Sequence, residues 1–176
     1  MSREVYLRGD INVENITKTS EEIRKLYKEN PEEEITLYIC SVGGIRSLAI
    51  SFYEWVNYKN IPLITVAIGE VSSAAVIVFL SGKKRRATLH SWFGIHPGGG
   101  GIKDDVWRQL LRMVSPWRYR EEMEWLRTVR SIEEEIIKEK VKLPEKQIRK
   151  ALTKAHLIFT AEKAKEVGLI DEIIQI

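Results

Sequence analysis

The feature of this sequence that most limits its fold is an alternation of short apolar runs with helix-like segments. The apolar runs at 35–40 and 63–68 contain hardly any polar residue, which is typical of strands covered on both faces. Residues 45–58 and 72–81 have the apolar spacing or the small-residue composition of helices. Because such strands and helices alternate through short turns, we predict an α/β fold with a mainly parallel sheet.

The segments outside this central pattern complete the prediction. We expect a helix over 15–30 with Thr19 or Ser20 as its cap, and a basic turn over 82–86. We predict further strands at 4–7, within 87–95, where there are one or two, and at 169–176. We predict further helices at 144–154 and 160–167, and Thr160 is expected to cap the second of them.

Residues 98–142 depart from the strand–helix alternation. They begin with four glycines and continue as a charged, Trp-rich segment with helical spacing of apolar residues. Pro116 must kink or interrupt this helical segment, because proline lacks the backbone N–H that a helix interior needs. The length of 176 residues fits one domain, 1–176, to which this segment belongs.

Composition excludes several classes of protein. The 28 basic and 25 acidic residues give a formal net charge of only +3, which indicates a mixed surface and no nucleic-acid partner. The N-terminus has no apolar secretory region, and the longest apolar run, 74–80, is too short to span a membrane. We therefore expect a soluble, cytoplasmic protein with no membrane partner.

The single cysteine agrees with a cytoplasmic protein, and the histidines indicate no metal site. A single cysteine, Cys40, cannot form an internal disulfide, and within its apolar run we expect it to be a buried thiol. The histidines lack companion Cys or carboxylate residues at metal-ligand spacing, and no nucleotide-binding loop is present. We therefore expect neither a metal nor another cofactor.

Three loops follow predicted strands, at the edge where parallel sheets place their sites. Gly43 and Gly44 open a helix, so their backbone N–H groups can face a cavity and form part of an oxyanion hole; a plain helix-entry turn is the alternative. Ser72 and Ser73 lie where a strand runs into a helix, where the helix dipole favours negative charge; capping the helix is the alternative.

His96 ends the third of these strands, before the glycine run. Histidine is the usual general base for a serine nucleophile, although a solvated histidine at a strand end is the alternative. A nucleophile, a base and oxyanion donors are the minimum set for acyl transfer, so their order at successive strand ends predicts a hydrolase.

These residues resemble the ClpP family of serine peptidases, the proteolytic subunits of Clp proteases, over nearly the whole chain. LYICSVGG at 37–44 resembles the family's LYINSPGG, and GEVSSAAV at 69–76 resembles GxAASMGA, which identifies Ser73 as the nucleophile. IHPGG at 95–99 resembles MIHQPxGG with one residue fewer after the histidine, and TA at 160–161 with EVGLID at 166–171 resembles the closing SAxEAxEYGLID.

The resemblance implies a crotonase-like fold of repeated ββα units, with a protruding helical handle at about 98–142. It also implies a homo-oligomer of two stacked heptameric rings that encloses the active sites. Unfolded proteins or peptides are the substrates, and a partner AAA+ ATPase delivers them. This chain starts almost at its first predicted strand, without the family's N-terminal axial hairpin, so its dependence on an ATPase is an open question.

The resemblance also assigns roles within the site. Ser73 attacks the peptide carbonyl, and His96 takes its proton and passes it to the leaving amine. The oxyanion is held by N–H groups of Gly43 or Gly44 and of Ala74. The substrate aligns as an added strand along the main chain of Gly98, Gly99, Gly100, Gly101 and Ile102.

One departure from the family concerns the third residue of the catalytic triad. Where the family has Asp four residues before its SA motif, this chain has His156. A neutral imidazole can hold the tautomer of His96 but supplies no full charge. Such a Ser-His-His triad is feasible, and herpesvirus proteases resemble that arrangement. We therefore expect a weaker enzyme or a regulatory subunit; the alternative is that His156 is only a surface residue. Val42 in place of Pro, and Ala74-Ala75 in place of Met-Gly, keep an apolar or small character.

Three alternatives stay open from the sequence. A weakly active or inactive ClpP-like scaffold or regulatory subunit would keep the fold without the chemistry. An acyl-CoA enzyme of the same superfold would need paired carboxylates near the loops, where Glu70 is alone. A Ser/Lys peptidase of the signal-peptide-degrading kind would need a lysine near the serine, and Lys83 and Lys84 are poorly placed after the nucleophile helix.

Overall fold

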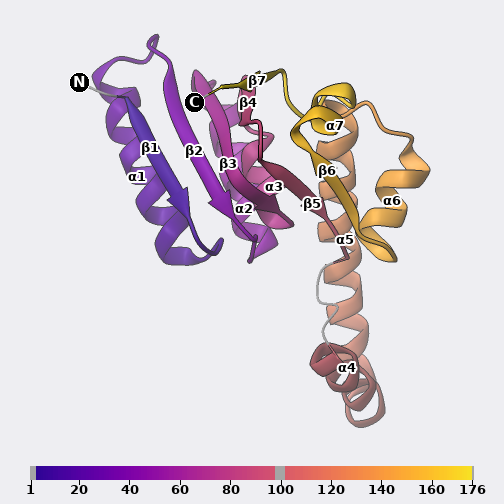
Figure 1. The fold of residues 1–176 in the computed structure, drawn as a ribbon. Helices are drawn as coiled ribbons and strands as arrows, with labels where there is room; N and C mark the ends of the chain where they lie inside the picture. Colours follow the sequence, from indigo (N-terminus) through magenta and orange to yellow (C-terminus); the bar gives the residue numbers. More distant parts are fainter. Residues whose placement is uncertain (1–2, 98–101, 176) are drawn as a thin grey trace.

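A computed structural model describes residues 3–97 and 102–175 of the chain (Figure 1). Its strands are β1 (Glu4–Arg8), β2 (Ile35–Ser41), β3 (Leu63–Ser72), β4 (Lys84–Thr88), β5 (Trp92–Ile95), β6 (Leu157–Thr160) and β7 (Glu172–Ile174). Its helices are α1 (Val13–Glu29), α2 (Arg46–Tyr58), α3 (Ala74–Phe79), α4 (Ile102–Val114), α5 (Pro116–Lys140), α6 (Glu145–Thr153) and α7 (Ala161–Glu166).

The strands form one mainly parallel sheet, which confirms the predicted fold class. Its order is β1-β2-β3-β4-β7, and every neighbouring pair along this path is parallel. The long strand β3 has two partners on the same side, because residues 64–67 pair with β4 and residues 70–72 pair with β5. β5 then pairs antiparallel with β6. This branching brings the ends of β3 and β5 and the start of β6 to one place.

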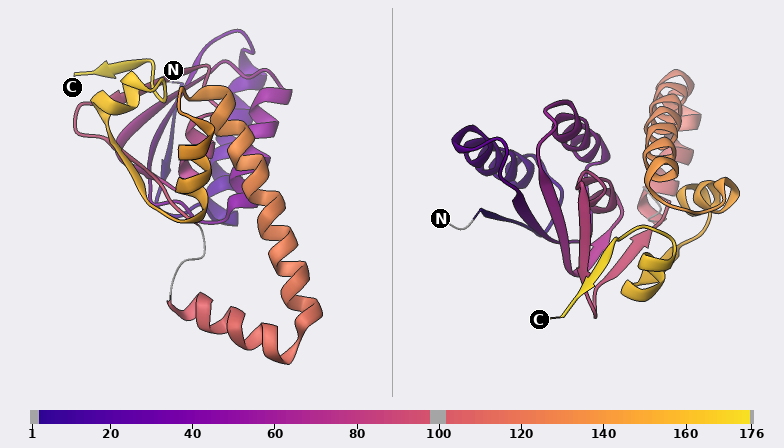
Figure 2. Two further views of the ribbon diagram at one scale, coloured as in Figure 1. Left: turned by 90° about the vertical axis from the view of Figure 1, so that its right-hand side faces the viewer. Right: turned by 90° about the horizontal axis from the view of Figure 1, so that it is seen from above.

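Helices α1, α2 and α3 lie on one face of the sheet (Figure 2). The core between them consists of side chains such as Leu37, Ala49 and Val76, each less than 2% exposed. Asn12 caps α1, since its side chain accepts a hydrogen bond from the backbone N–H of Asn15 at 2.8 Å. The cap predicted at Thr19 or Ser20 was wrong, because both residues lie inside α1.

Helices α4 and α5 project away from the sheet as a hairpin (Figures 1 and 2). Pro116 is the first residue of α5, so it separates the two helices as predicted. The C-terminal half of α5 packs on the core, where Ile136 and Ile137 are buried, whereas Trp107 and Trp117 on the projecting part are more than half exposed. No helix within the described ranges is long and apolar enough to cross a membrane.

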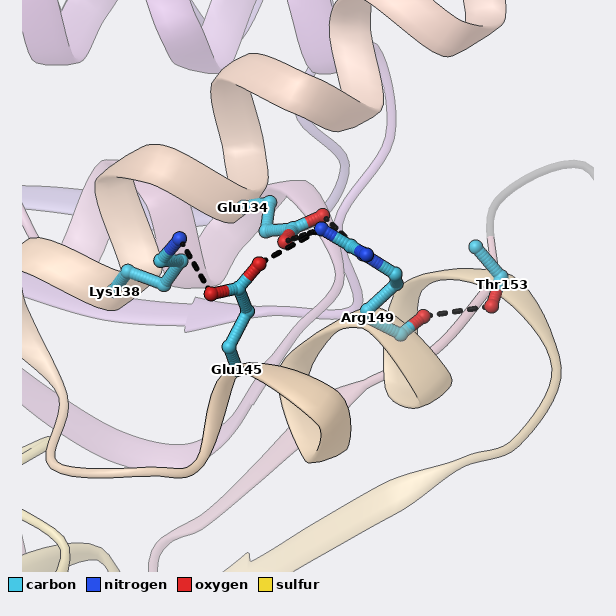
Figure 3. Close-up of polar contacts among 5 residues, drawn as sticks. All are labelled: Glu134, Lys138, Glu145, Arg149 and Thr153. Carbon is cyan, nitrogen blue, oxygen red and sulfur yellow. Dashed lines mark hydrogen bonds and ion pairs between the residues drawn. The ribbon is translucent and has the colours of Figure 1, made fainter.

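Polar contacts hold α6 against α5 (Figure 3). Arg149 on α6 donates to Glu134 on α5 at 3.1 Å and to Glu145 at 2.8 Å. Lys138 on α5 pairs with Glu145 at 3.1 Å. Surface ion pairs stabilise a protein only slightly one by one. The Arg149–Glu134 and Lys138–Glu145 contacts join α6 to α5, whereas the Arg149–Glu145 contact lies within α6. They set α6 beside the pocket into which its residue Leu152 projects.

The prediction that both faces of β2 are covered was wrong. Ile35, Leu37 and Ile39 are buried beneath the helices, but Cys40 points to the opposite face and is exposed. No described helix covers that face beside β1 and β2 (Figure 2), which leaves the thiol open. The basic turn predicted at 82–86 was also wrong in part, because β4 begins at Lys84 and continues the sheet.

Candidate active site

Ser73 occupies a strained turn between β3 and α3. Its backbone has φ 56° and ψ −129°, a conformation that residues other than glycine rarely adopt. The backbone N–H of Ser73 donates to Gly94 on β5 at 2.7 Å, which fixes the turn. Sharp strand-to-helix turns of this kind expose the side chain of a nucleophile. Ser73 is half-buried, whereas Ser72 is 5% exposed.

His96 follows β5 and lines the same pocket as Ser73, a nearly filled cavity of about 10 Å³. The two residues meet because β5 pairs with the end of β3 in a register that places Gly94 opposite Ser72. Between the side chains of Ser73 and His96, both in the described part of the chain, there is no hydrogen bond in this structure. Catalytic hydrogen bonds are often long before substrate binds.

The ring of His96 is oriented by its neighbour in the chain. Its Nδ1 lies 3.0 Å from the main-chain oxygen of Pro97. Because a carbonyl oxygen can only accept, Nδ1 carries the hydrogen in this contact, and Nε2 has the free lone pair of a base. The Pro97 carbonyl therefore selects the tautomer that a serine hydrolase needs.

His156 lies beside His96 but is not arranged as the third residue of a hydrogen-bonded triad. The ring centroids of the two imidazoles are 5.3 Å apart, and their planes are inclined by only 12°, so the rings are stacked. The antiparallel pairing of β5 with β6 produces this proximity, since Ile95 is opposite Leu157. In this arrangement His156 contacts the face of the His96 ring.

The turn that contains Gly43 and Gly44 lies against the turn that carries Ser73. A Cβ added at Gly43 would come within 2.6 Å of Ser73 Cβ and 3.0 Å of Ala74 N, so these three residues are in close contact. The N–H of Gly43 donates to Ser41 Oγ at 3.1 Å and is thereby engaged in this conformation. Ala74 begins α3, where the first backbone N–H groups have no partner within the helix. Its N–H is accordingly a suitable oxyanion donor.

Of the residues predicted to align the substrate, Gly98, Gly99, Gly100 and Gly101 lie outside the described residues, so that role stays a prediction. Ile102 is the first residue of α4. Within residues 3–97 and 102–175, no three His, Cys, Asp or Glu residues are grouped so that they could hold a metal ion.

Sequence reasoning missed two charged residues of the pocket, Arg46 and Glu133. Arg46 is the first residue of α2, and Glu133 comes from α5. Their charged groups are 3.3 Å apart, and the residues are 8% and 3% exposed. Burial raises the pKa of Glu133, and the positive charges of Arg46 and Arg130 counteract this only in part. In the sequence, nothing distinguishes Glu133 from Glu134 and Glu135.

Comparison with known proteins places these features in a family. The sequence model of the Clp protease family matches residues 1–176. The chain is 27% identical over 175 residues to ATP-dependent Clp protease proteolytic subunit 1 of Rhodopirellula baltica, covering 98% of this chain and 72% of that protein. It is 29% identical over 181 residues to ATP-dependent Clp protease proteolytic subunit 2 of Frankia casuarinae, covering 98% and 76%. The chain therefore belongs to the Clp protease family.

Proposed function

We propose that this chain is a serine endopeptidase in which Ser73 is the nucleophile and His96 the general base. The observation that carries the proposal is that both side chains line one pocket at the start of α3. The strained turn exposes Ser73, and Pro97 holds the tautomer of His96. Membership of the Clp protease family supports peptide-bond hydrolysis as the reaction.

In this mechanism Ser73 Oγ attacks the peptide carbonyl while His96 Nε2 accepts its proton. His96 then protonates the leaving amine, and an acyl-enzyme remains on Ser73 until water attacks it. The N–H groups of Ala74 and Gly44 hold the oxyanion, and that of Gly43 joins them when Ser41 Oγ releases it. His156 packs on the imidazole and acts as the third residue by holding that ring in place.

We also propose a single domain over 1–176 that assembles as a homo-oligomeric ring chamber in the cytoplasm, with 98–142 as the handle. The exposed Trp107, Met113 and Trp117 on the projecting helices support contact with another copy, because exposed aromatic and Met side chains are common in interfaces. The names of the relatives, ATP-dependent proteolytic subunits, support an ATPase partner. Mass photometry that finds only monomers at micromolar concentration contradicts the ring.

The proposed chemistry is tested by covalent labelling with a fluorophosphonate. The assembled wild-type protein should be labelled on Ser73, and the Ser73→Ala variant should not react. Ser72→Ala is the matched control, because Ser72 is the adjacent serine but its Oγ is buried without a hydrogen-bond partner, and this variant should still be labelled. Absence of labelling in the wild type would favour a scaffold or regulatory subunit, which the stacked His156 in place of a carboxylate also favours.

A further inference from the structure

A buried ion pair beside the catalytic residues joins α2 to α5. Arg46 is the first residue of α2, and Glu133 lies on the half of α5 that packs on the core. Their charged groups are 3.3 Å apart, and their side chains are 9% and 4% exposed. Arg130 also lies near Glu133, but both of these residues belong to α5. Arg130 therefore cannot hold α5 against α2, whereas Arg46 can.

Stability alone does not explain this pair. Two buried charges are often no more stabilising than two apolar side chains of similar volume, because both charges lose their hydration. The surrounding walls, which include Val76, Ile137 and Leu152, are aliphatic, so apolar residues would suit both positions. An ion pair adds a fixed position, because separating two buried charges is costly while apolar side chains can slide past one another.

A second polar contact shows that α2 and α5 are matched along their lengths. The ammonium group of Lys140 on α5 lies beside the hydroxyl of the buried Tyr53 on α2. Arg46 and Tyr53 are seven residues apart, and so are Glu133 and Lys140, an interval of about two helical turns. The two helices therefore run in the same direction, and sliding one along the other would break both contacts.

The start of α2 determines where the turn at Gly43 and Gly44 lies. Arg46 follows this turn after one residue, Ile45, which is the N-cap of α2 and whose apolar side chain cannot accept a hydrogen bond from the helix. Gly43 in turn lies in close contact with Ser73. A displacement of Arg46 along α5 would therefore be passed through the turn to the backbone N–H groups that face the nucleophile.

We propose that Arg46 and Glu133 are positioning residues that hold the oxyanion donors at Gly43 and Gly44 in place against Ser73. The inference rests on the proposed function, because these donors matter to the reaction only if Ser73 attacks a carbonyl. The pair acts through the backbone of the turn and not by contact with substrate. Its loss should slow the reaction without weakening the binding that precedes it, because the oxyanion develops only in the transition state.

The first test follows fluorophosphonate labelling of Ser73 over a range of probe concentrations, which separates the maximal rate from the half-saturating concentration. The variant Arg46→Met/Glu133→Leu removes both charges at similar volume and should keep most of the wild-type stability. Its maximal rate should fall about 10- to 100-fold, the cost of a displacement of up to about 1 Å at a reacting centre. Its half-saturating concentration should stay within about threefold of wild type.

Two further variants show whether this pair, and not helix packing in general, positions the site. Tyr53→Phe removes the other polar contact between the same helices and should label within about threefold of the wild-type rate. Arg46→Lys keeps the charge, and because the pair is a single ion contact, this variant should label at least about threefold faster than the double variant. The inference is wrong if the double variant labels at the wild-type rate, or if Tyr53→Phe slows labelling equally.

Hydrogen exchange at Ile45 separates this inference from the proposed chemistry. The N–H of Ile45 donates to the main-chain oxygen of Ile11 at 2.8 Å, so its exchange rate, measured by mass spectrometry, reports how firmly the turn is held. This hydrogen should exchange about tenfold faster in the double variant than in the wild type, and Tyr53→Phe should not change it.

The two measurements together distinguish the possible failures. If the wild type is not labelled but exchange at Ile45 responds as expected, the pair still holds the turn and the peptidase proposal fails. Unchanged exchange at Ile45 in the double variant overturns the inference whether or not the wild type is labelled.

Discussion

Gly43→Ala should damage the site in a way that a second glycine of the chain does not. Gly43 has φ +100°, and an added Cβ would lie 2.6 Å from Ser73 Cβ and 2.7 Å from the main-chain oxygen of Ser72. Ordinary contact begins at 3.4 Å, so the two Cβ atoms must separate by about 0.8 Å. Both neighbours belong to the fixed turn that carries the nucleophile, so the turn itself must move.

The magnitude follows from two contributions. An L-residue at positive φ costs about 1–2 kcal/mol, and forcing extra volume into a packed site costs about 1–3 kcal/mol, so Gly43→Ala should lower the free energy of unfolding by about 2–5 kcal/mol. Gly9→Ala is the control, because Gly9 has φ +80° but its added Cβ would meet nothing closer than 3.8 Å. It should lose only the first contribution.

Two assays check this prediction at a fixed protein concentration. Urea unfolding measures the stability of both variants, and fluorophosphonate labelling measures the reactivity of Ser73. A displacement of this size should slow labelling of Gly43→Ala about 100-fold, while Gly9→Ala should label at the wild-type rate. The reasoning is refuted if Gly43→Ala labels within threefold of wild type, or if both variants are equally destabilised.

Three further predictions concern the charged and imidazole groups of the pocket. His156→Ala should slow labelling only about 2- to 10-fold, the size of a lost ring stack, whereas His96→Ala should slow it about 100- to 10,000-fold; equal losses would mean that His156 does more than stack. Arg46→Met should lower the free energy of unfolding by about 3–5 kcal/mol because it leaves Glu133 buried without this partner, and Arg46→Met/Glu133→Leu should regain most of it in urea denaturation. The folded-state pKa of Glu133 is raised above 4.5, so its favourable contribution to the free energy of unfolding is complete below pH 4.5 and is lost as pH rises through the folded-state pKa. The stability of Glu133→Gln, measured by urea denaturation, should therefore fall less than that of the wild type over this pH interval. An equal fall in both proteins would contradict the burial of Glu133.

Local sequence patterns were sufficient for most of the fold. The run 63–68 is apolar on both faces, and β3 is indeed buried on both faces from Leu63 to Ala67. For β2 the same pattern was misleading, because the exposure of Cys40 depends on which face the helices cover. Which face of the sheet the helices cover is a property of the tertiary structure, and a local run of six residues does not specify it.

The candidate site divides in a similar way. Ser73 and His96 follow strands, so the edge of a parallel sheet predicts their proximity. Arg46 and Glu133 meet only because the end of α5 packs beside α2, and helical spacing does not specify that packing. The stack of His156 on His96 likewise depends on the register of β5 with β6.

The pairing of β4 with β7 sets an order on the folding of this chain. Arg86 is opposite Glu172, and the backbone N–H of Arg85 donates to the Asp171 carboxylate at 2.7 Å. On the ribosome, the outer edge of β4 therefore lacks its partner until residue 174 has emerged. Unpaired strand edges readily pair with strands of other molecules. The growing chain therefore exposes an aggregation-prone strand edge through about half of its synthesis, and chaperones that bind such edges should act on it during that period.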